Sequence, residues 1–227
     1  MQIDKSIGIM QPYFFPYLGY FQLISAVECY VNLDHVSFMK RSYMTRNSLK
    51  NNITFGLQVN KGSQNNCCDN TVVNFDNRHV KKTLKTIEQL YSKSTNYDKI
   101  MTHIVLPTFE ERQVTVSEFN MSTIKIVCEY FGIKTSIVES SRQFDVGLKS
   151  AEMLIDITKK LSGRTYINAI GGQKIYEKNV FEDKGISLRF LKMGEVQLED
   201  PYKSILHQLF NYDTDHLIGQ LSNFSLV

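Results

Sequence analysis

The stretch IGIMQPYFFPYLGYFQLISA, residues 7–26, brings polar and aromatic side chains together with two prolines. Because a proline disfavours helical geometry in the residue before it, we expect Gln11 to be extended, with its amide free to face a ligand. Tyrosine rings can stack on a base or a sugar and can also donate hydrogen bonds. The alternative is that these rings belong to the core. We take as ligand-binding candidates Gln11, Tyr13, Tyr17 and Tyr20.

A basic cluster follows in VSFMKRSYMTRNSLK, residues 36–50, which mixes lysine and arginine with aromatic residues. Guanidinium groups match phosphate oxygens in geometry, and an aromatic face can hold a base or a sugar. The segment therefore predicts a diphosphate site that uses Lys40, Arg41 and Arg46. The alternative is a solvated basic loop.

Asp34 and His35 stand directly before the basic cluster. Histidine titrates near neutral pH, and a carboxylate at a strand end can accept a proton or bind a hydroxyl or an ammonium group, so either residue could be a general base. Adjacent residues of an extended backbone point to opposite faces. We therefore expect only one of the two, with a preference for Asp34, to face a ligand.

The segment NAIGGQKIY, residues 168–176, is a further candidate loop. Paired glycines after a strand let backbone N–H groups approach a ligand closely, which makes Gly171, Gly172 and the nearby Tyr176 candidates for substrate binding. The spacing matches neither a P-loop nor a GxGxxG fingerprint. A plain Gly-Gly turn is the alternative.

The histidines and cysteines show no metal-site spacing. Adjacent Cys67 and Cys68 match no common zinc pattern, and His79 and His103 have no second ligand at useful spacing. We therefore predict no metal site.

Each candidate loop follows a predicted strand. Short apolar runs predict strands at 7–10, 28–33, 53–59, 134–138, 165–168 and 186–191. Helical periodicity predicts helices from residue 17, over 146–161 with Asp145 as N-cap, from about Gln173, and at 202–209 and 215–221. A helical excursion covers about 78–131. This alternation predicts an α/β fold with a mostly parallel sheet, flanking helices and a helical middle segment. The carboxyl ends of parallel strands meet at one edge, where ligands of such sheets bind.

The chain has 227 residues, of which 42% are hydrophobic and 22% charged, as in ordinary folded proteins. We expect a single domain over 1–227. The net charge of +3 is too small to indicate a nucleic-acid-binding surface over the whole molecule. The N-terminus contains an early acidic residue and no apolar stretch of membrane-spanning length, so we predict a cytoplasmic protein without a membrane partner.

The segments IMQPYFFPYLGYFQLI and VNLDHVSFMKRSYMTRN closely resemble the WbqC-like family of bacterial polysaccharide-cluster proteins. The likeness continues over almost the full length, at Tyr166-Ile167, at Gly171 to Tyr176, at Gly185 to Phe190 and at Ser204 to Asn211. The Arg46-Asn47 pair of the motif adds Asn47 to the binding candidates. His207 stands where the family favours an aspartate.

The resemblance implies a role in the biosynthesis of O-antigen, part of lipopolysaccharide, as a glycine transferase that acts on a nucleotide-linked amino sugar such as 4-amino-4,6-dideoxyglucose. Under this hypothesis the enzyme is an aminoacyl transferase, and Gly171 and Gly172 donate N–H groups to a phosphate or to the oxyanion of acyl transfer. Free glycine as the donor would require ATP and magnesium, whereas glycyl-tRNA would require an RNA-binding surface. The cofactor, the donor and the oligomeric state stay open.

Two other functions fit the same sequence. One is a non-catalytic protein that binds a nucleotide sugar or partners a pathway enzyme, with the same basic and aromatic residues but no turnover. The other is a nucleotidyltransferase-like enzyme on a similar sheet, which is disfavoured because the chain lacks a His-x-Gly-His signature.

Overall fold

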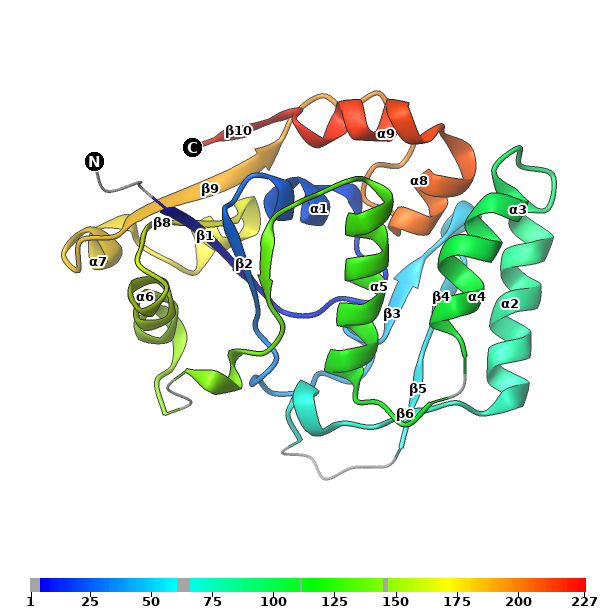
Figure 1. The fold of residues 1–227 in the computed structure, drawn as a ribbon, viewed down its shortest axis with the longest axis horizontal. Coiled ribbons are helices and arrows are strands. Elements are labelled where there is room, and N and C mark those ends of the chain that lie inside the picture. Colours follow the sequence, from blue (N-terminus) through cyan, green and yellow to red (C-terminus); the bar gives the residue numbers. More distant parts are fainter. Residues whose placement is uncertain (1–4, 61–65, 111, 145–146) are drawn as a thin grey trace.

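A computed structural model of the protein describes residues 5–60, 66–110, 112–144 and 147–227. Its centre is a six-stranded sheet in the order β10-β9-β8-β1-β2-β7 (Figure 1). Strands β9 and β10 pair antiparallel, and the other neighbours pair in parallel. The predicted α/β class is thus confirmed. The strands are β1 (Lys5–Met10), β2 (Cys29–Asn32), β7 (Ser136–Val138), β8 (Gly163–Ala169), β9 (Ser187–Met193) and β10 (Phe224–Leu226), the last of which was not predicted.

Helices cover both faces of this sheet. Helix α1 (Leu18–Ser25) packs on one face, where a Cβ on Gly8 would lie 2.9 Å from the Leu23 side chain. Ile7 and Ile9 point to the other face, into a core shared with α6 (Ser150–Lys160) and α7 (Lys178–Glu182). Burial on both faces explains why β1 reads as a continuous apolar run rather than an alternating one.

The helical middle segment is confirmed and lies at the opposite end of the molecule from α6 and α7 (Figure 1). Helix α5 begins after Thr115, which forms a capping box with Glu118. Ser117 lies in the first turn of α5. The segment consists of α2 (Asn77–Tyr91), α3 (Tyr97–Ile100), a π-helical turn (Met101–Val105), α4 (Leu106–Thr108) and α5 (Val116–Tyr130).

The predicted strand at 53–59 is divided into two. Strand β4 (Thr54–Gly56) pairs with β3 (Arg46–Ser48), whereas β5 (Gln58–Val59) pairs with β6 (Val73–Asn74). The division falls at Leu57, whose N–H donates to the Thr45 carbonyl at 2.7 Å and so leaves neither ladder continuous.

Several helix starts differ from prediction. The helix predicted from residue 17 begins at Leu18, and the one predicted at 202–209 begins at Ile205. The Ile205 N–H donates to the Pro16 carbonyl at 2.9 Å, so the two helix starts are in contact. The helix expected from Gln173 is a 3-10 turn, Ile170–Lys174. Helix α6 begins at Ser150, and the predicted cap Asp145 lies outside the described residues.

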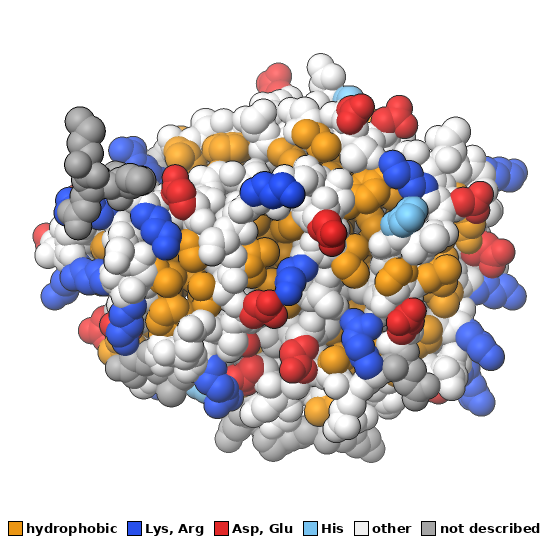
Figure 2. Space-filling model, viewed as in Figure 1, with side chains coloured by type: hydrophobic (Ala, Val, Ile, Leu, Met, Phe, Trp, Pro, Cys, Tyr) orange, Lys and Arg blue, Asp and Glu red, His pale blue; other side chains and the backbone are white. Residues whose placement is uncertain are grey.

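Helices α8 (Ile205–Asn211) and α9 (Thr214–Leu221) close the fold near the sheet. On the face drawn in Figure 2, which carries α5, lysine and arginine side chains alternate with acidic ones and no large block of one sign appears. Among the described residues, no helix has both the length and the apolar character needed to cross a membrane.

His207, on α8, is buried and gives the protein a testable pH dependence. The Tyr91 hydroxyl accepts from the Lys50 N–H and lies 2.9 Å from His207 Nδ1, so it has a proton to donate to that nitrogen. Asn211 Nδ2 lies 3.2 Å from the same nitrogen. Burial, with a smaller effect of Lys203, lowers the pKa of His207. Protonation therefore favours the unfolded chain, in which histidine titrates near 6.5.

We expect the free energy of unfolding to decrease as the pH falls through about 6.5 towards 5, because the unfolded state binds the proton first. The glutamine variant, His207→Gln, keeps an acceptor for Tyr91 but cannot titrate, so its stability should change less over this range. Urea unfolding at pH 7.5, 6.5 and 5.5 measures both slopes. Equal slopes for the two proteins would show that His207 makes no contribution.

Candidate functional site

The strand order creates a crevice between β1 and β8. From β1 the chain crosses to β2 on one side, and from β8 it crosses to β9 on the other side, although β1 and β8 are neighbours. Loops that leave adjacent parallel strands in opposite directions open a gap outside the carboxyl ends of those strands, where ligands of α/β sheets bind. The topology therefore places a candidate site between the loops after Met10 and Ala169.

A cavity of about 460 Å³ occupies this position, and we call it the sheet-edge cavity. Its walls come from the loop after β1, the loop after β8 and the exposed ring of Tyr43. Six of the predicted binding residues line it: Gln11, Tyr13, Tyr17, Gly171, Gly172 and Tyr176. Asn168 and Tyr43 line it as well, although neither was selected from the sequence.

Aromatic rings dominate one wall of the sheet-edge cavity. The Tyr13 ring centroid lies 5.7 Å from that of Tyr43, and the Tyr13 hydroxyl is 3.4 Å from Gln11 Oε1. Burial, followed by the neighbouring Tyr43, raises the pKa of Tyr13, and burial raises that of Tyr17 and of Tyr176. These phenols stay protonated, so they offer hydrogen-bond donors and ring faces rather than a base.

Tyr20 lies behind this wall and does not line the sheet-edge cavity. Its side chain is buried, and its hydroxyl donates to the Gln11 carbonyl at 2.7 Å and contacts the Tyr30 hydroxyl. The predicted stacking role is therefore corrected. A ring buried in the core cannot meet a ligand, and Tyr20 instead fixes the backbone of Gln11.

Asn47 is also buried, and it supports the aromatic loop. Its Nδ2 donates to the carbonyls of Phe14, at 3.2 Å, and Phe15, at 2.8 Å. The Ser204 hydroxyl donates to the same Phe15 carbonyl at 2.9 Å, and Phe15 has a positive φ of 40°. Asn47 therefore positions this loop. It also lines a hollow of about 380 Å³ together with Arg41 and Arg46, so its contact with substrate stays a prediction.

Asp34 is buried and its carboxylate is fully engaged. It accepts hydrogen bonds from the Ser117 hydroxyl at 2.9 Å, the Ser140 hydroxyl at 3.0 Å, and the Ser141 N–H and hydroxyl at 2.9 and 3.0 Å. These bonds join the end of β2 to α5 and to the segment after β7. Because Asp34 lines none of the cavities described here, the geometry gives it a structural role in place of the predicted base.

His35 points away from Asp34, as expected for adjacent residues in extended backbone. Its Nδ1 lies 3.3 Å from Asp69 Oδ2, which also accepts from Arg142 Nε at 2.6 Å. Cys67 Sγ lies within 4.8 Å of the same ligand atoms of His35 and Asp69. Because Arg142 already supplies a positive charge to Asp69, we interpret this group as an ion-pair cluster outside the sheet-edge cavity.

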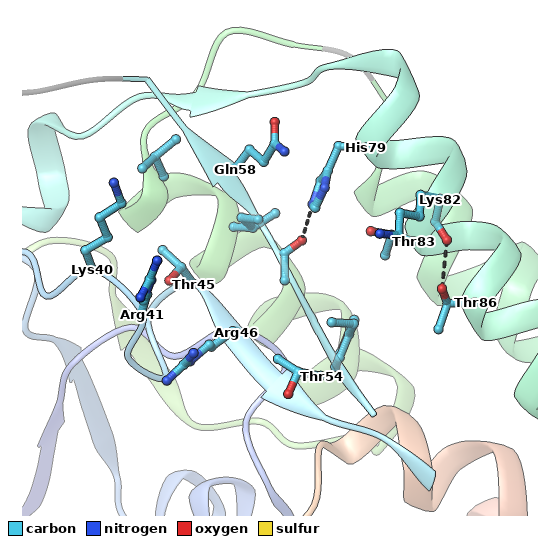
Figure 3. Close-up of a pocket in the computed structure, with 14 residues that line it drawn as sticks. Lys40, Arg41, Thr45, Arg46, Thr54, Gln58, His79, Lys82, Thr83 and Thr86 are labelled. Carbon is cyan, nitrogen blue, oxygen red and sulfur yellow. Dashed lines mark hydrogen bonds between the residues drawn. The ribbon is translucent and has the colours of Figure 1, made fainter. Parts of the chain in front are cut away.

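The basic candidates line a second hollow of about 490 Å³ between the β3–β4 hairpin and α2, which we call the basic hollow (Figure 3). Lys40, Arg41 and Arg46 form one wall. Arg41, Arg46 and Tyr43 also line a smaller hollow of about 380 Å³, so Tyr43 borders both this space and the sheet-edge cavity. The predicted residues thus divide into two sites that approach each other at Tyr43.

The opposite wall of the basic hollow was missed from the sequence. His79, Lys82, Thr83 and Thr86 lie on α2 and line the basic hollow. Their spacing of three, four and seven residues places them on one helix face, a signal that could have identified them. From the sequence, His79 was considered only as a possible metal ligand.

A model of the WbqC-like protein family matches residues 11–217. The chain belongs to this family. It is also similar to "Uncharacterized protein Rv1507c" of Mycobacterium tuberculosis, with 24% identity over 219 residues that cover 91% of this chain and 94% of the relative. No solved structure matches the chain. The family match confirms the resemblance seen at the opening motif. In this WbqC-like protein the motif contributes Gln11, Tyr13 and Tyr17 to the sheet-edge cavity.

The two glycines of the WbqC-like protein's second loop should respond differently to substitution. A Cβ on Gly172 would lie 2.6 Å from Asn168 Nδ2, whereas a Cβ on Gly171 meets no atom within 4 Å. Asn168 Oδ1 accepts from the Ala169 N–H at 2.8 Å, so displacing this side chain disturbs the strand end. We expect Gly172→Ala to lower the free energy of unfolding by about 1–3 kcal/mol and Gly171→Ala to be near neutral. Urea denaturation compares the two, and equal losses would contradict the packing argument.

Proposed function

We propose that this WbqC-like protein transfers an aminoacyl group, glycyl, to the amine of a nucleotide-linked deoxyamino sugar in O-antigen biosynthesis, in the cytoplasm. The observation that carries the proposal is the sheet-edge cavity, which joins aromatic rings to a neighbouring arginine pair through Tyr43. A sugar can lie against Tyr13, Tyr17 and Tyr176. Its diphosphate can then reach Arg41 and Arg46, since guanidinium groups favour phosphate oxygens.

The chemistry must supply a neutral amine. The amine nitrogen attacks the acyl carbonyl carbon, an amide bond forms, the bond to the donor's leaving group breaks, and the amine loses a proton. Among the described residues, neither a carboxylate nor a histidine lines the sheet-edge cavity. An aromatic cavity without a negative charge disfavours an ammonium ion by desolvation. We infer that the cavity promotes attack by binding the amine in its neutral form, with the proton lost to solvent.

The direct test is mass spectrometry of a nucleotide-linked 4-amino-4,6-dideoxyhexose incubated with the protein, glycine and ATP-magnesium, with and without glycyl-tRNA. A product heavier by one glycyl group is expected in one of the two conditions, and that condition identifies the donor. No product in either condition, with the sugar nucleotide still bound, would contradict acyl transfer.

The placement of the diphosphate has its own test. The double variant Arg41→Ala, Arg46→Ala should bind the sugar nucleotide at least about tenfold more weakly in calorimetry, because each charge-assisted hydrogen bond contributes about 1.5–3 kcal/mol. Lys85→Ala, on the exposed side of α2, is the matched control. Unchanged affinity in the double variant would show that the diphosphate lies elsewhere.

One observation favours a second function, a non-catalytic nucleotide-sugar-binding protein. The ionisable side chains that line the sheet-edge cavity are tyrosines, and burial raises the pKa of Tyr13, Tyr17, Tyr166 and Tyr176. The cavity therefore offers binding groups rather than a general base. This protein would bind the sugar nucleotide with the same dependence on Arg41 and Arg46 and would form no product with either donor.

A further inference from the structure

The basic hollow contains more positive charge than a diphosphate of one sugar nucleotide requires. Lys40 and Arg41 come from the segment before β3, Arg46 is the first residue of β3, and Lys82 faces them from α2 (Figure 3). These two segments are separated by about forty residues in the chain, and only the tertiary fold brings them to the same space. Four cations around one concave surface create a local positive potential that attracts polyanions.

These cations lack acidic partners. Within the described part of the chain, no carboxylate oxygen lies within salt-bridge distance of Lys40, Arg41, Arg46 or Lys82, and no aspartate or glutamate lines the basic hollow. Three lysines elsewhere in the described residues form ion pairs: Lys125 with Glu139, Lys160 with Asp156, and Lys203 with Asp200. Like charges gathered without counterions repel one another, and a bound anion removes that repulsion.

The walls of the basic hollow are held in place by the backbone. Arg41 has a φ of 64°, in the left-handed region that a residue with a Cβ rarely adopts, and such strain concentrates at binding sites. His79 Nε2 lies 2.7 Å from the Gly56 carbonyl, which fixes the ring against β4. The Leu57 N–H donates a hydrogen bond to the Thr45 carbonyl, which holds the other side of the hairpin in place.

The basic hollow also has an apolar lining, formed by Phe55, Leu57 and Val59, which we call its apolar floor. Thr45 and Thr54 line the same hollow (Figure 3). A volume of about 490 Å³ falls in the range of sites for small organic ligands and cofactors. A flat base can rest on the apolar floor while a phosphate chain meets the cations and hydroxyl groups.

We propose that the basic hollow binds a nucleoside triphosphate, as a site separate from the sheet-edge cavity, with Lys40 and Lys82 on opposite sides of the phosphate chain. The binding site stands on the geometry of the hollow alone. Its use for activating glycine rests on the proposed function. In that case the two ligands would approach each other at Arg41, Arg46 and Tyr43, which lie between the two spaces.

The test is calorimetric titration of the full chain with ATP and with AMP at 50 and 200 mM salt. ATP should bind at least tenfold more tightly than AMP, and its affinity should fall with salt, because the additional phosphates meet the cations. Lys40→Ala and Lys82→Ala should each weaken ATP binding about tenfold. Lys81→Ala and Lys85→Ala, on exposed positions of the same helix, should change it less than twofold. Wild-type ATP affinity in Lys82→Ala, or equal losses in all four variants, would overturn the proposal.

A further variant tests the triphosphate site independently of the proposed transfer of a glycyl group. Gly171→Phe directs a ring from a position with open space into the sheet-edge cavity. It should abolish binding of the sugar nucleotide and leave the affinity for ATP unchanged. Loss of ATP binding in Gly171→Phe would contradict a separate site. In the wild-type protein, ATP binding without any glycyl product would support the triphosphate site and reject the transfer reaction.

Discussion

The variant Asn120→Asp is expected to lose on the order of 3 kcal/mol or more of its free energy of unfolding. Asn120 is fully buried on α5, and its Nδ2 donates to the carbonyls of Pro12, at 2.9 Å, and Met44, at 2.8 Å. Aspartate offers no amide donor and places a carboxylate beside two carbonyl oxygens. Each unsatisfied buried group costs about 1–3 kcal/mol, and an unpaired buried charge costs more.

Urea denaturation measures this loss, and Asn52→Asp is the control because it makes the same chemical change at an exposed position. The control should stay within about 0.5 kcal/mol of the wild type. Asn120→Asp should also weaken sugar-nucleotide binding, since Pro12 and Met44 belong to the two segments that carry Tyr13 and Tyr43. Equal stability of the two variants would refute the role of Asn120 in holding these segments together.

Replacing Asp34 with alanine is expected to lower the free energy of unfolding by more than about 3 kcal/mol. The substitution leaves the hydroxyls of Ser117 and Ser141 and the Ser141 N–H without their acceptor, and hydrogen bonds to a charged group contribute about 1.5–3 kcal/mol each. His35→Ala is the neighbouring control. Its half-buried ring makes one contact with Asp69, at 3.3 Å, and its removal should cost less than about 1.5 kcal/mol.

The same pair of variants distinguishes a structural Asp34 from a catalytic one. A structural carboxylate lost to alanine should reduce product formation in proportion to the fraction of protein that is folded, as followed by circular dichroism. Full stability in Asp34→Ala together with loss of the glycylated product would return Asp34 to the role of general base and would contradict the geometry.

Local sequence patterns predicted most of the fold. The apolar runs that became β1 and β2 are buried on both faces, so their composition alone separates them from amphipathic helices. Strand β9 was predicted from a partly alternating pattern, and its Arg189 and Lys192 are exposed. Strand β10 was missed because three residues with exposed positions carry almost no hydrophobic signal. The division between β4 and β5 was missed because it depends on a contact with Thr45, which is distant in sequence.

The sequence by itself determined the class of fold and the family. It also identified two loops of the candidate site, the tyrosine-rich loop after β1 and the Gly171-Gly172 loop after β8. Each of these depends on residues that are close together in the chain. Only the tertiary structure decided which side chains face a ligand. Tyr20 has the same chemistry as its accessible neighbours, yet the packing of α1 turns it inward. Lys82 joins the basic hollow because long-range packing brings α2 beside the hairpin. Residue spacing marks a common face on α2, but only the tertiary packing decides what that face meets.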